Sequence, residues 1–358
     1  AYAQDAPKAP ITPQPGHPPE QVVGGQPAPV HGGGYCPTGE CDSQGHYGHG
    51  GYFHTGCGTC CGPCQNRGGF SAGIDLLYLQ PRLNRDPAFF ITRGGAAVDS
   101  EVTFDRDYEF SPRIWLGYTG SNGMGGRIRY WEFDDDTSEN FTIPGAPAGT
   151  FVTTNVQGAG NNLGNFFAIG VGNNVNAEAE LEMDTFDIEV THAKSWCDTA
   201  VIASIGVRHA NIEQSYRIVE VVPGGGIGPG GTLRTSTDLD GWGPTIGFDL
   251  VRSVGQGGLG VFFSLRGSLL AVDREGSTDS LNAAGVVINS ARTTGDDFIS
   301  TGEFGLGVQY GGELGSSTGV FVRAGYEAQL WTDVGGPLVI DDGDLALHGL
   351  IISIGVSR

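Results

Sequence analysis

The chain has 358 residues, of which 62 are Gly and 19 are Pro, and only 16% are charged. The 40 acidic residues outnumber the 19 basic ones, and the net charge of −21 argues against a nucleic-acid partner, because phosphates repel acidic surfaces. No apolar run reaches the roughly 18 residues that a helical membrane span needs, so that class is excluded. A chain of this kind can cross a bilayer only as a closed sheet.

The first 68 residues differ in composition from the rest. They are rich in Pro, Gly and His and lack alternating apolar positions, so they cannot bury a core of their own. We expect an irregular extension over residues 1–68 and one all-β domain over residues 69–358. The start Ala1-Tyr2-Ala3 has the small-x-small pattern of a signal-peptidase site, which predicts export with a mature chain that begins at Gln4.

Six of the seven cysteines lie in this extension. The disulfide candidates are Cys36, Cys41, Cys57, Cys60, Cys61 and Cys64, and the last four form two C-x-x-C pairs. That spacing also suits a tetrahedral zinc site on Cys57, Cys60, Cys61 and Cys64. Export favours disulfides, because oxidation competes with metal loading. Cys197 is left over, either as a free thiol or as an intermolecular link.

Ten later segments alternate apolar residues with polar or small ones. They cover residues 70–79, 112–120, 126–134, 184–192, 200–209, 244–252, 260–270, 302–311, 319–331 and 347–356. Antiparallel strands of this period, about 9 to 11 residues long and separated by turns, are typical of a barrel that crosses a membrane. Further segments at 96–106, 150–157, 212–222 and 282–292 are either extensions of these strands or extra strands, which leaves a barrel of twelve strands as an alternative to ten.

The connections between these segments differ in length. Long connections are expected at 135–180, 212–238 and 273–299, and short ones at 119–125, 193–199, 253–259 and 312–318. Their rough alternation predicts a barrel with tight turns at one rim and exposed loops at the other.

The two faces of the predicted strands have opposite chemistry. One face is apolar, as in Ile114, Leu116 and Ile188. The other face supplies the predicted pore-lining residues Asp75, Arg113, Arg127, Arg129, Asp187, Glu189, Arg208, Asp249, Arg266, Glu303, Gln309, Arg323, Glu327 and Gln329. Its six arginines balance six acids, so a narrow lumen either passes small polar solutes or is closed by a salt-bridged plug.

A soluble sandwich of two sheets shows the same alternation with the apolar side turned inward. That alternative predicts an exported adhesin or surface-layer component that is cross-linked through the N-terminal cysteines. The barrel is favoured because aromatic residues near strand ends are typical of a membrane interface. These residues are Tyr78, Tyr118, Trp131, Trp242, Tyr310 and Trp331.

Few residues suggest chemistry. Acidic clusters at 134–136, 296–297 and 341–344 are expected in loops, either as solvated turns or as Ca²⁺ ligands, and no other cofactor is expected. His192, His209 and His348 have no Ser or acid at a matched spacing, so we expect no enzyme.

Several segments resemble a known family in their order and spacing. They are GIDLLYLQPR (73–82), DYEFSPRIWLGY (107–118), RIRYWEF (127–133), DLDGWGPTIGFDLVR (238–252) and LHGLIISIGV (347–356). Over residues 70–358 the chain resembles the Legionella-type major outer-membrane-protein family of pore-forming barrels, in its planctomycete-like form. The resemblance implies a porin-like or structural barrel in the lipid bilayer of a bacterial outer membrane. The chain departs from many such barrels in ending on Arg358 rather than an aromatic residue. Long loops and cysteines also suit a homo-oligomer.

Overall fold

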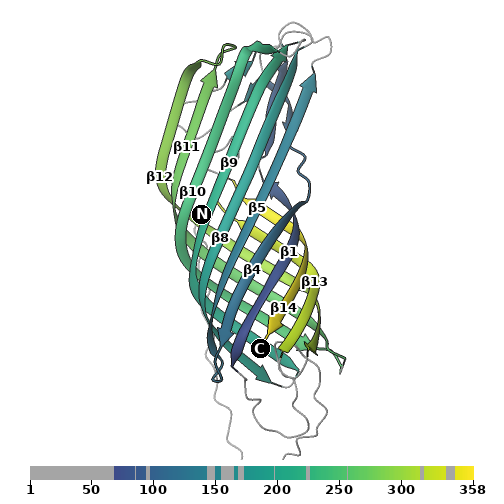
Figure 1. Ribbon diagram of the computed structural model, residues 1–358. Helices are drawn as coiled ribbons and strands as arrows, with labels where there is room; N and C mark the ends of the chain where they lie inside the picture. Colours follow the sequence, from purple (N-terminus) through teal and green to yellow (C-terminus); the bar gives the residue numbers. More distant parts are fainter. Residues whose placement is uncertain are drawn as a thin grey trace, which may run out of the picture. The chain divides into compact units, whose positions relative to one another are not determined.

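The computed structural model describes residues 68–84, 86–93, 97–142, 150–154, 165–167, 173–196, 198–222, 226–255, 257–314, 318–335 and 343–358. Ten antiparallel strands close into a barrel in the order β1-β14-β13-β12-β11-β10-β9-β8-β5-β4, with β4 pairing back onto β1 (Figure 1). The predicted all-β barrel with ten strands is therefore confirmed. The sandwich is wrong, because each barrel strand pairs with a neighbour on both sides and the sheet closes on itself.

The barrel strands have very unequal lengths. They are β1 (Gly69–Leu83), β4 (Glu109–Thr119), β5 (Met124–Thr142), β8 (Asn174–Trp196), β9 (Thr199–Val222), β10 (Gly226–Ser253), β11 (Leu259–Leu281), β12 (Val287–Leu314), β13 (Thr318–Trp331) and β14 (Leu345–Ser357). The six strands β5, β8, β9, β10, β11 and β12 continue well past the other four and form a tall wall (Figure 1). We call the part of these six strands beyond the other four the extension, and residues 1–68 the N-terminal extension.

The first and last strands of the barrel begin and end at the rim that carries the short turns. Gly69 pairs with Thr119 beside the turn at 120–123, and Ser71 pairs with Ser357. The connections from β8 to β9, from β10 to β11 and from β12 to β13 are likewise short, as predicted. In bacterial outer-membrane barrels the short turns face the periplasm, so the extension faces the outside of the cell.

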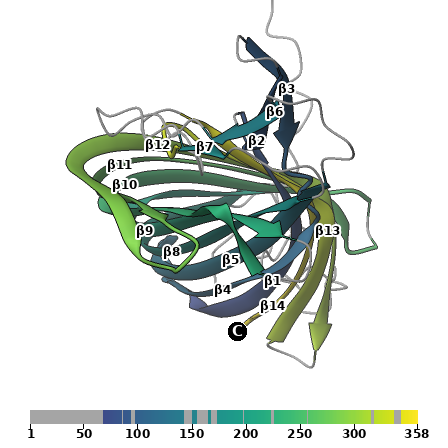
Figure 2. The same cartoon turned by 90° about the horizontal axis from the view of Figure 1, so that it is seen from above.

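Four further strands form a second sheet that is not part of the ring. It contains β2 (Pro87–Arg93), β3 (Ala97–Thr103), β6 (Thr150–Thr154) and β7 (Asn165–Phe167), in the order β3-β2-β6-β7 (Figure 2). Phe89 and Ile91 of β2 pack in one apolar cluster with Tyr216 and Ile218 of β9, and the Tyr216 hydroxyl donates a hydrogen bond to the Ala88 carbonyl at 2.6 Å. This contact ties the β1–β4 connection to the inner side of the extension.

The structure corrects three predictions about the loops. The alternative of twelve strands is wrong, because segments 96–106 and 150–157 supply β3 and β6 of the separate sheet. Segments 212–222 and 282–292 contribute to β9 and β12 instead of forming new strands. The expected long loops at 212–238 and 273–299 are mostly the paired ends of long hairpins, and the 135–180 connection starts and ends as β5 and β8. Ladder hydrogen bonds satisfy a polar backbone outside the bilayer as well as inside it, so strands need not end at the membrane surface.

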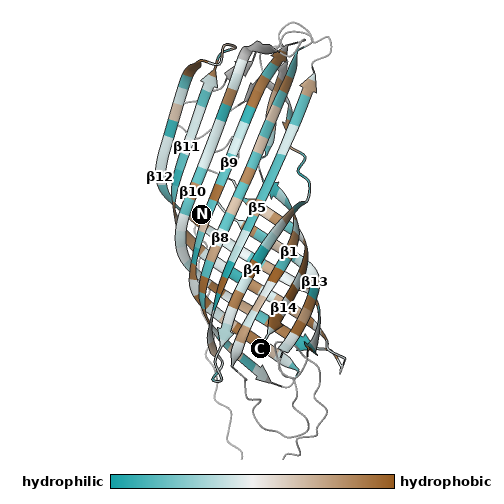
Figure 3. Cartoon of the chain, in the orientation of Figure 1, coloured by the Kyte–Doolittle hydropathy of each residue, from teal (hydrophilic) through white to brown (hydrophobic). Residues whose placement is uncertain are grey.

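The lower part of the barrel carries an outer band of apolar side chains (Figure 3). Examples on three strands are Ile114 at 53% exposed, Ile205 at 63% and Leu350 at 60%. Exposure of so many large apolar side chains is stable only against lipid. The aromatic residues Tyr78, Tyr118, Trp242 and Tyr310 are exposed on this outer surface, as expected. Trp131 and Trp331 were placed wrongly, since they are 3% and 0% exposed inside the barrel.

Candidate functional site in the barrel lumen

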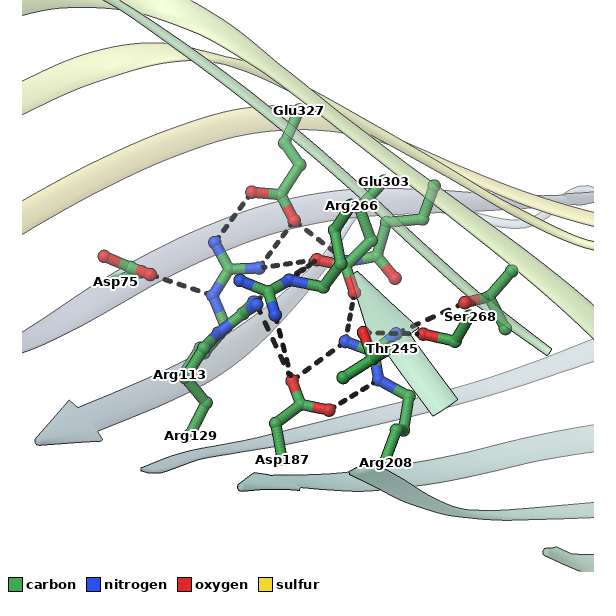
Figure 4. A network of polar contacts seen from close by, with 12 residues as sticks. Asp75, Arg113, Arg129, Asp187, Arg208, Thr245, Arg266, Ser268, Glu303 and Glu327 are labelled. Carbon is green, nitrogen blue, oxygen red and sulfur yellow. Dashed lines mark hydrogen bonds and ion pairs between the residues drawn. The ribbon is translucent and has the colours of Figure 1, made fainter. Parts of the chain in front are cut away.

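Glu303 on β12 lies at the centre of an ion-pair network inside the barrel (Figure 4). Its carboxylate is 2.5 Å from Nη2 of Arg208 and 3.2 Å from Nη2 of Arg129. It is also 3.8 Å from the guanidinium nitrogens of both Arg113 and Arg266. One carboxylate therefore contacts four arginines, which makes it the most highly connected acid of the network.

Arg113 on β4 joins strands that are not neighbours. Its Nε is 2.8 Å from Asp75 on β1, and its two terminal nitrogens hold Glu327 on β13 at 2.8 and 2.7 Å (Figure 4). Two parallel hydrogen bonds of this kind give an arginine–carboxylate pair strength and a defined orientation. Because β1 and β14 separate β4 from β13 in the ring, the pair crosses the lumen.

Arg208 on β9 makes the second crossing. Its Nε and Nη2 hold the two oxygens of Asp187 on β8 at 2.7 and 2.9 Å, and Nη2 also reaches Glu303. β10 and β11 lie between β9 and β12 in the ring. Arg208 is only 1% exposed, so this guanidinium is fully removed from water.

The network continues toward the short turns. Arg127 on β5 binds Glu189 on β8 at 2.7 Å and Asp249 on β10 at 2.9 Å. Arg266 on β11 also pairs with Glu189 and lies 3.9 Å from Asp187. Glu189 is therefore shared by two arginines, as Glu303 is shared by four.

Side-chain amides extend the network at both ends. Gln329 donates a hydrogen bond to Glu327 at 2.9 Å and accepts one from the indole N–H of Trp331 at 3.3 Å. Gln309 accepts a hydrogen bond from Nε of Arg323 at 2.7 Å. The structure thus places all fourteen predicted residues on the inner side of the barrel and brings them into one lumen, where they bind one another.

An inner apolar layer lies immediately beyond the charged network, toward the extension, and sequence reasoning missed it. Its members are buried side chains from nine barrel strands: Leu79, Trp131, Phe133, Leu181, Met183, Ile212, Leu239, Leu270, Val272, Ile299, Trp331, Leu345 and Leu347. Trp131 and Trp331 stack at 6.4 Å between ring centroids, and Trp331 lies over Arg208 at 6.0 Å. The charged network and this inner apolar layer therefore fill successive parts of the lumen.

A sequence signal for this layer exists, because the apolar face of each long strand changes sides. On β5 the outward residues Ile128 and Tyr130 are followed by outward Glu132, while the apolar Trp131 and Phe133 point inward. Within the bilayer, apolar side chains on the outer face of the barrel contact lipid. Beyond the bilayer the outer face contacts water, so apolar side chains are more stable when they are buried on the inner face. The point at which the alternation reverses therefore marks the membrane boundary.

A third layer closes the end near the short turns. The rings of Trp115 and Phe321 stack at 6.3 Å, and the guanidinium of Arg323 lies over Phe321 at 4.6 Å and over Phe262 at 5.3 Å. A cavity of about 90 Å³ lies between these rings and the network, and Arg127 is among the residues that line it. Such a volume holds a few water molecules.

Inward-facing glycines make room for these rings. A Cβ at Gly73 would overlap the Trp115 indole, and a Cβ at Gly355 would overlap the Phe321 ring. Glycine is needed at these two positions for close packing in a narrow lumen rather than for an unusual backbone conformation.

The outer face of the extension carries an acidic belt. It consists of Glu132, Asp134, Asp136, Glu178, Glu180, Glu182, Asp184, Glu213, Asp238, Asp240, Asp273, Glu275, Asp279 and Asp296. Several of these residues face each other directly across strands, for example Asp134 opposite Glu182 and Asp273 opposite Asp296. Like charges in such positions destabilise a sheet.

The acidic belt should make the extension more stable at low pH. Partial burial, followed by neighbouring carboxylates such as Glu180, raises the pKa of Asp134 and of Glu182. An acid whose pKa is raised on folding holds its proton more tightly in the folded state, so stability rises as the pH falls through the carboxylate range and is lost above the folded pKa. We expect Asp134→Asn with Glu182→Gln to stabilise the extension at neutral pH by about 0.2 to 1 kcal/mol and to flatten this pH dependence.

Hydrogen exchange of β8 amides in detergent, followed against pH, measures this effect. Glu101→Gln on β3 is the matched control, because that exposed acid lies outside the acidic belt. Because amide exchange itself slows as the pH falls, the quantity compared is the protection factor relative to an unstructured peptide at the same pH. Lower protection at low pH in the unmodified protein would contradict the expectation.

Other candidate residues have simpler positions. The clusters 134–136 and 296–297 lie on β5 and β12 rather than in loops, and residues 341–342 and all six disulfide candidates lie outside the described residues. Carboxylate oxygens of Asp134, Glu180 and Glu182 lie within 4.8 Å of one another at the surface, and of these three residues only Asp134 belongs to a predicted Ca²⁺ cluster.

The histidines on the strands lie apart from one another along the barrel. His209 contacts Asp240 at 2.8 Å on the outer surface just beyond the apolar band. His348 accepts a hydrogen bond from Arg82 at 3.1 Å, and His192 is exposed near a short turn.

A closed ring of ten strands with an apolar outer band and a polar lumen defines a bacterial outer-membrane β-barrel. Among the described residues, no helix is long and apolar enough to cross a membrane. Residues 62–356 match the family described as Legionella pneumophila major outer membrane protein precursor, and the chain belongs to this family. The resemblance expected from the sequence is therefore confirmed, as is the location in the outer membrane.

Several solved structures of outer-membrane proteins are similar to this chain at low identity and low TM-score. The outer membrane protease OmpT from Escherichia coli is 10% identical with a TM-score of 0.44, over 84% of this chain and 98% of that one. The outer membrane protein OprG from Pseudomonas aeruginosa is 8% identical with a TM-score of 0.30, over 81% and 96%. The toluene transporter TodX from Pseudomonas putida is 6% identical with a TM-score of 0.26, over 83% and 90%. No curated protein matches the sequence.

Proposed function

We propose that this protein is a structural outer-membrane barrel whose lumen is closed to solutes in its resting state. The observation that carries the proposal is the pair of crossings by Arg113 and Arg208, which bind acids on strands three places away in the ring. The inner apolar layer adds a second barrier, because ions do not cross a dry apolar layer without losing their hydration. The fully buried Arg208 and Trp331 support both barriers.

A gated passage for small polar solutes is the second candidate. It is favoured by one observation: both barriers consist of side chains projecting from the barrel wall. Side chains change rotamer far more readily than a packed backbone segment moves. The cavity beside Arg127 would then be a resting place along the route.

Planar-bilayer recordings separate the two candidates. The unmodified protein, folded and inserted, is expected to give no stable current steps. The variant Arg113→Ser, Glu327→Ser and Trp331→Ala removes three side chains from one side of both barriers, and it is expected to give current. Because it removes the bridge between β4 and β13 together with one charge of each sign, it leaves the net charge unchanged.

The control for these recordings is Arg217→Ser with Glu178→Ser. This pair is exposed and 3.1 Å apart on the outer face of the extension, so its loss should not open the lumen. Stable, uniform steps from the unmodified protein would contradict the closed barrel and support the gated passage.

The remaining sequence predictions belong to the same proposal. We expect no enzymatic activity, since the His–Asp contact found within the described residues, His209 with Asp240, lies on the outer surface rather than in a cleft. A homo-oligomer, disulfides in the N-terminal extension, a cleaved signal peptide and Ca²⁺ at the surface acids stay predictions.

A further inference from the structure

The extension has a long open edge at β12. β12 pairs with β11 along nearly its whole length, but its pairing with β13 begins only at Thr301, opposite Trp331. Among the described residues, no strand pairs with the other side of residues 287–300. In Figures 1 and 2 this part of β12 forms the margin of the tall wall.

The register shows which backbone groups face the open edge. The Ser300 carbonyl accepts a hydrogen bond from the Thr332 N–H at 3.0 Å, so Ser300 points toward the β13 side. From Asn289 to Tyr310 the pairing with β11 is regular, without a bulge. Backbone groups alternate along a strand, so within this regular range the even-numbered residues Ser290, Arg292, Thr294, Asp296 and Phe298 present their N–H and C=O groups to this edge.

Within the described part of the chain, only one of these backbone groups has a hydrogen-bond partner. The Phe298 N–H donates to the Asp297 carboxylate at 2.8 Å. Residues 287–300 contain neither Pro nor Lys, which commonly protect edge strands from pairing. Val287 and Ile288 at the tip are 51% and 66% exposed.

The opposite edge of the same wall is covered differently. On β5 the Glu132 carbonyl accepts a hydrogen bond from the Ser111 hydroxyl at 2.5 Å, and the Thr137 hydroxyl donates to the Asp105 carbonyl at 3.1 Å. The β1–β4 connection thus lies along β5, whereas no described segment lies along the edge of β12.

The surroundings of the β12 edge are acidic. Asp296 lies on β12 itself, and Asp273, Glu275 and Asp279 lie on the neighbouring β11, against a single arginine, Arg292, on the edge. Asp297 is already paired with Arg274 of β11 at 3.1 Å. A second copy of this chain would bring the same acids to the edge and be repelled. A cationic strand would gain both ladder hydrogen bonds and charge complementarity.

We propose that the edge of β12 over residues 288–296 binds an extended cationic peptide segment of another protein as an added β-strand on the outside of the cell. Main-chain hydrogen bonds supply the affinity, and the acids of β11 and β12 select the charge. This interaction is independent of whether the lumen conducts.

The probe is a fluorescent peptide of about ten residues that alternates Thr or Val with Lys, added to the full-length protein in detergent. We expect saturable binding by fluorescence anisotropy that weakens with added salt. A peptide with N-methyl groups on alternate residues cannot complete the ladder, and one with Glu in place of Lys has the wrong charge. Both should bind at least about tenfold more weakly, as loss of about 1.4 kcal/mol implies.

The matched variants are Thr294→Pro and Ser138→Pro. Proline removes an N–H, so Thr294→Pro should abolish binding without breaking the pairing of β12 with β11, since the Thr294 N–H faces the open edge. Ser138→Pro makes the same change on β5, the opposite edge strand, and should leave binding unchanged. Unchanged thermal stability of the barrel shows that Thr294→Pro still folds.

Three results would overturn the proposal. They are equal binding of the Lys and Glu peptides, full binding by Thr294→Pro, and a dimer in sedimentation that Thr294→Pro converts to a monomer. The last result would assign the edge to a second copy of the chain.

Discussion

Replacing Glu303 by Gln is expected to destabilise the barrel by about 3 to 5 kcal/mol, because the change removes one partner of a buried ion-pair network. Gln keeps the shape of the side chain but no longer balances the four arginines around it, of which Arg208 and Arg266 are almost fully buried. Arg208 in particular is 1% exposed, so bulk water cannot replace the lost charge at its guanidinium.

The midpoint of heat-modifiable gel migration and urea unfolding in detergent both measure this loss. Glu275→Gln on β11 is the matched control: it removes the same charge from an exposed position in the acidic belt and should change stability by less than about 0.5 kcal/mol. Equal stability of the two variants would show that the network does not hold the barrel together.

Replacing Trp331 by Ala is expected to cost about 3 to 5 kcal/mol through the cavity it leaves in the inner apolar layer. Trp331 is fully buried, stacks on Trp131, covers Arg208 and donates its indole N–H to Gln329. Its removal also leaves the Gln329 carbonyl oxygen without that donor.

Trp242→Ala provides the comparison. Trp242 is 54% exposed on the outer surface and contacts His209, so its loss should cost less than about 1 kcal/mol in detergent. Unfolding in urea, followed by tryptophan fluorescence and by gel migration, distinguishes the two. A larger loss for Trp242 than for Trp331 would contradict the packed lumen.

The strand pattern could be predicted because it is local. Alternation in segments such as 184–192 and 302–311 depends only on neighbouring residues, and it identified both the ten strands and the side of each strand that meets lipid. The same alternation placed Arg113, Arg208 and Glu303 on the inner face. Segments 96–106 and 150–157 also read correctly as strands, but their pairing in a separate sheet depends on contacts far away in the chain.

The errors at Trp131, Trp331 and the long connections have one cause. A single orientation rule along each strand fails because β5 and β8 pass from lipid into water and reverse their apolar side there. Beyond that boundary aromatic residues face the lumen instead of the membrane interface, and the acidic stretches continue as paired strands instead of loops.

The sequence by itself determined the class of fold, the number of barrel strands, and which charged and amide side chains face the lumen, because a period of two assigns each residue to a face without reference to any other strand. Only the tertiary structure decided which arginine binds which acid. Closing the ring brings β4 opposite β13 and β9 opposite β12, and the resulting pairs of Arg113 with Glu327 and Arg208 with Glu303 follow from barrel curvature rather than from spacing along the chain.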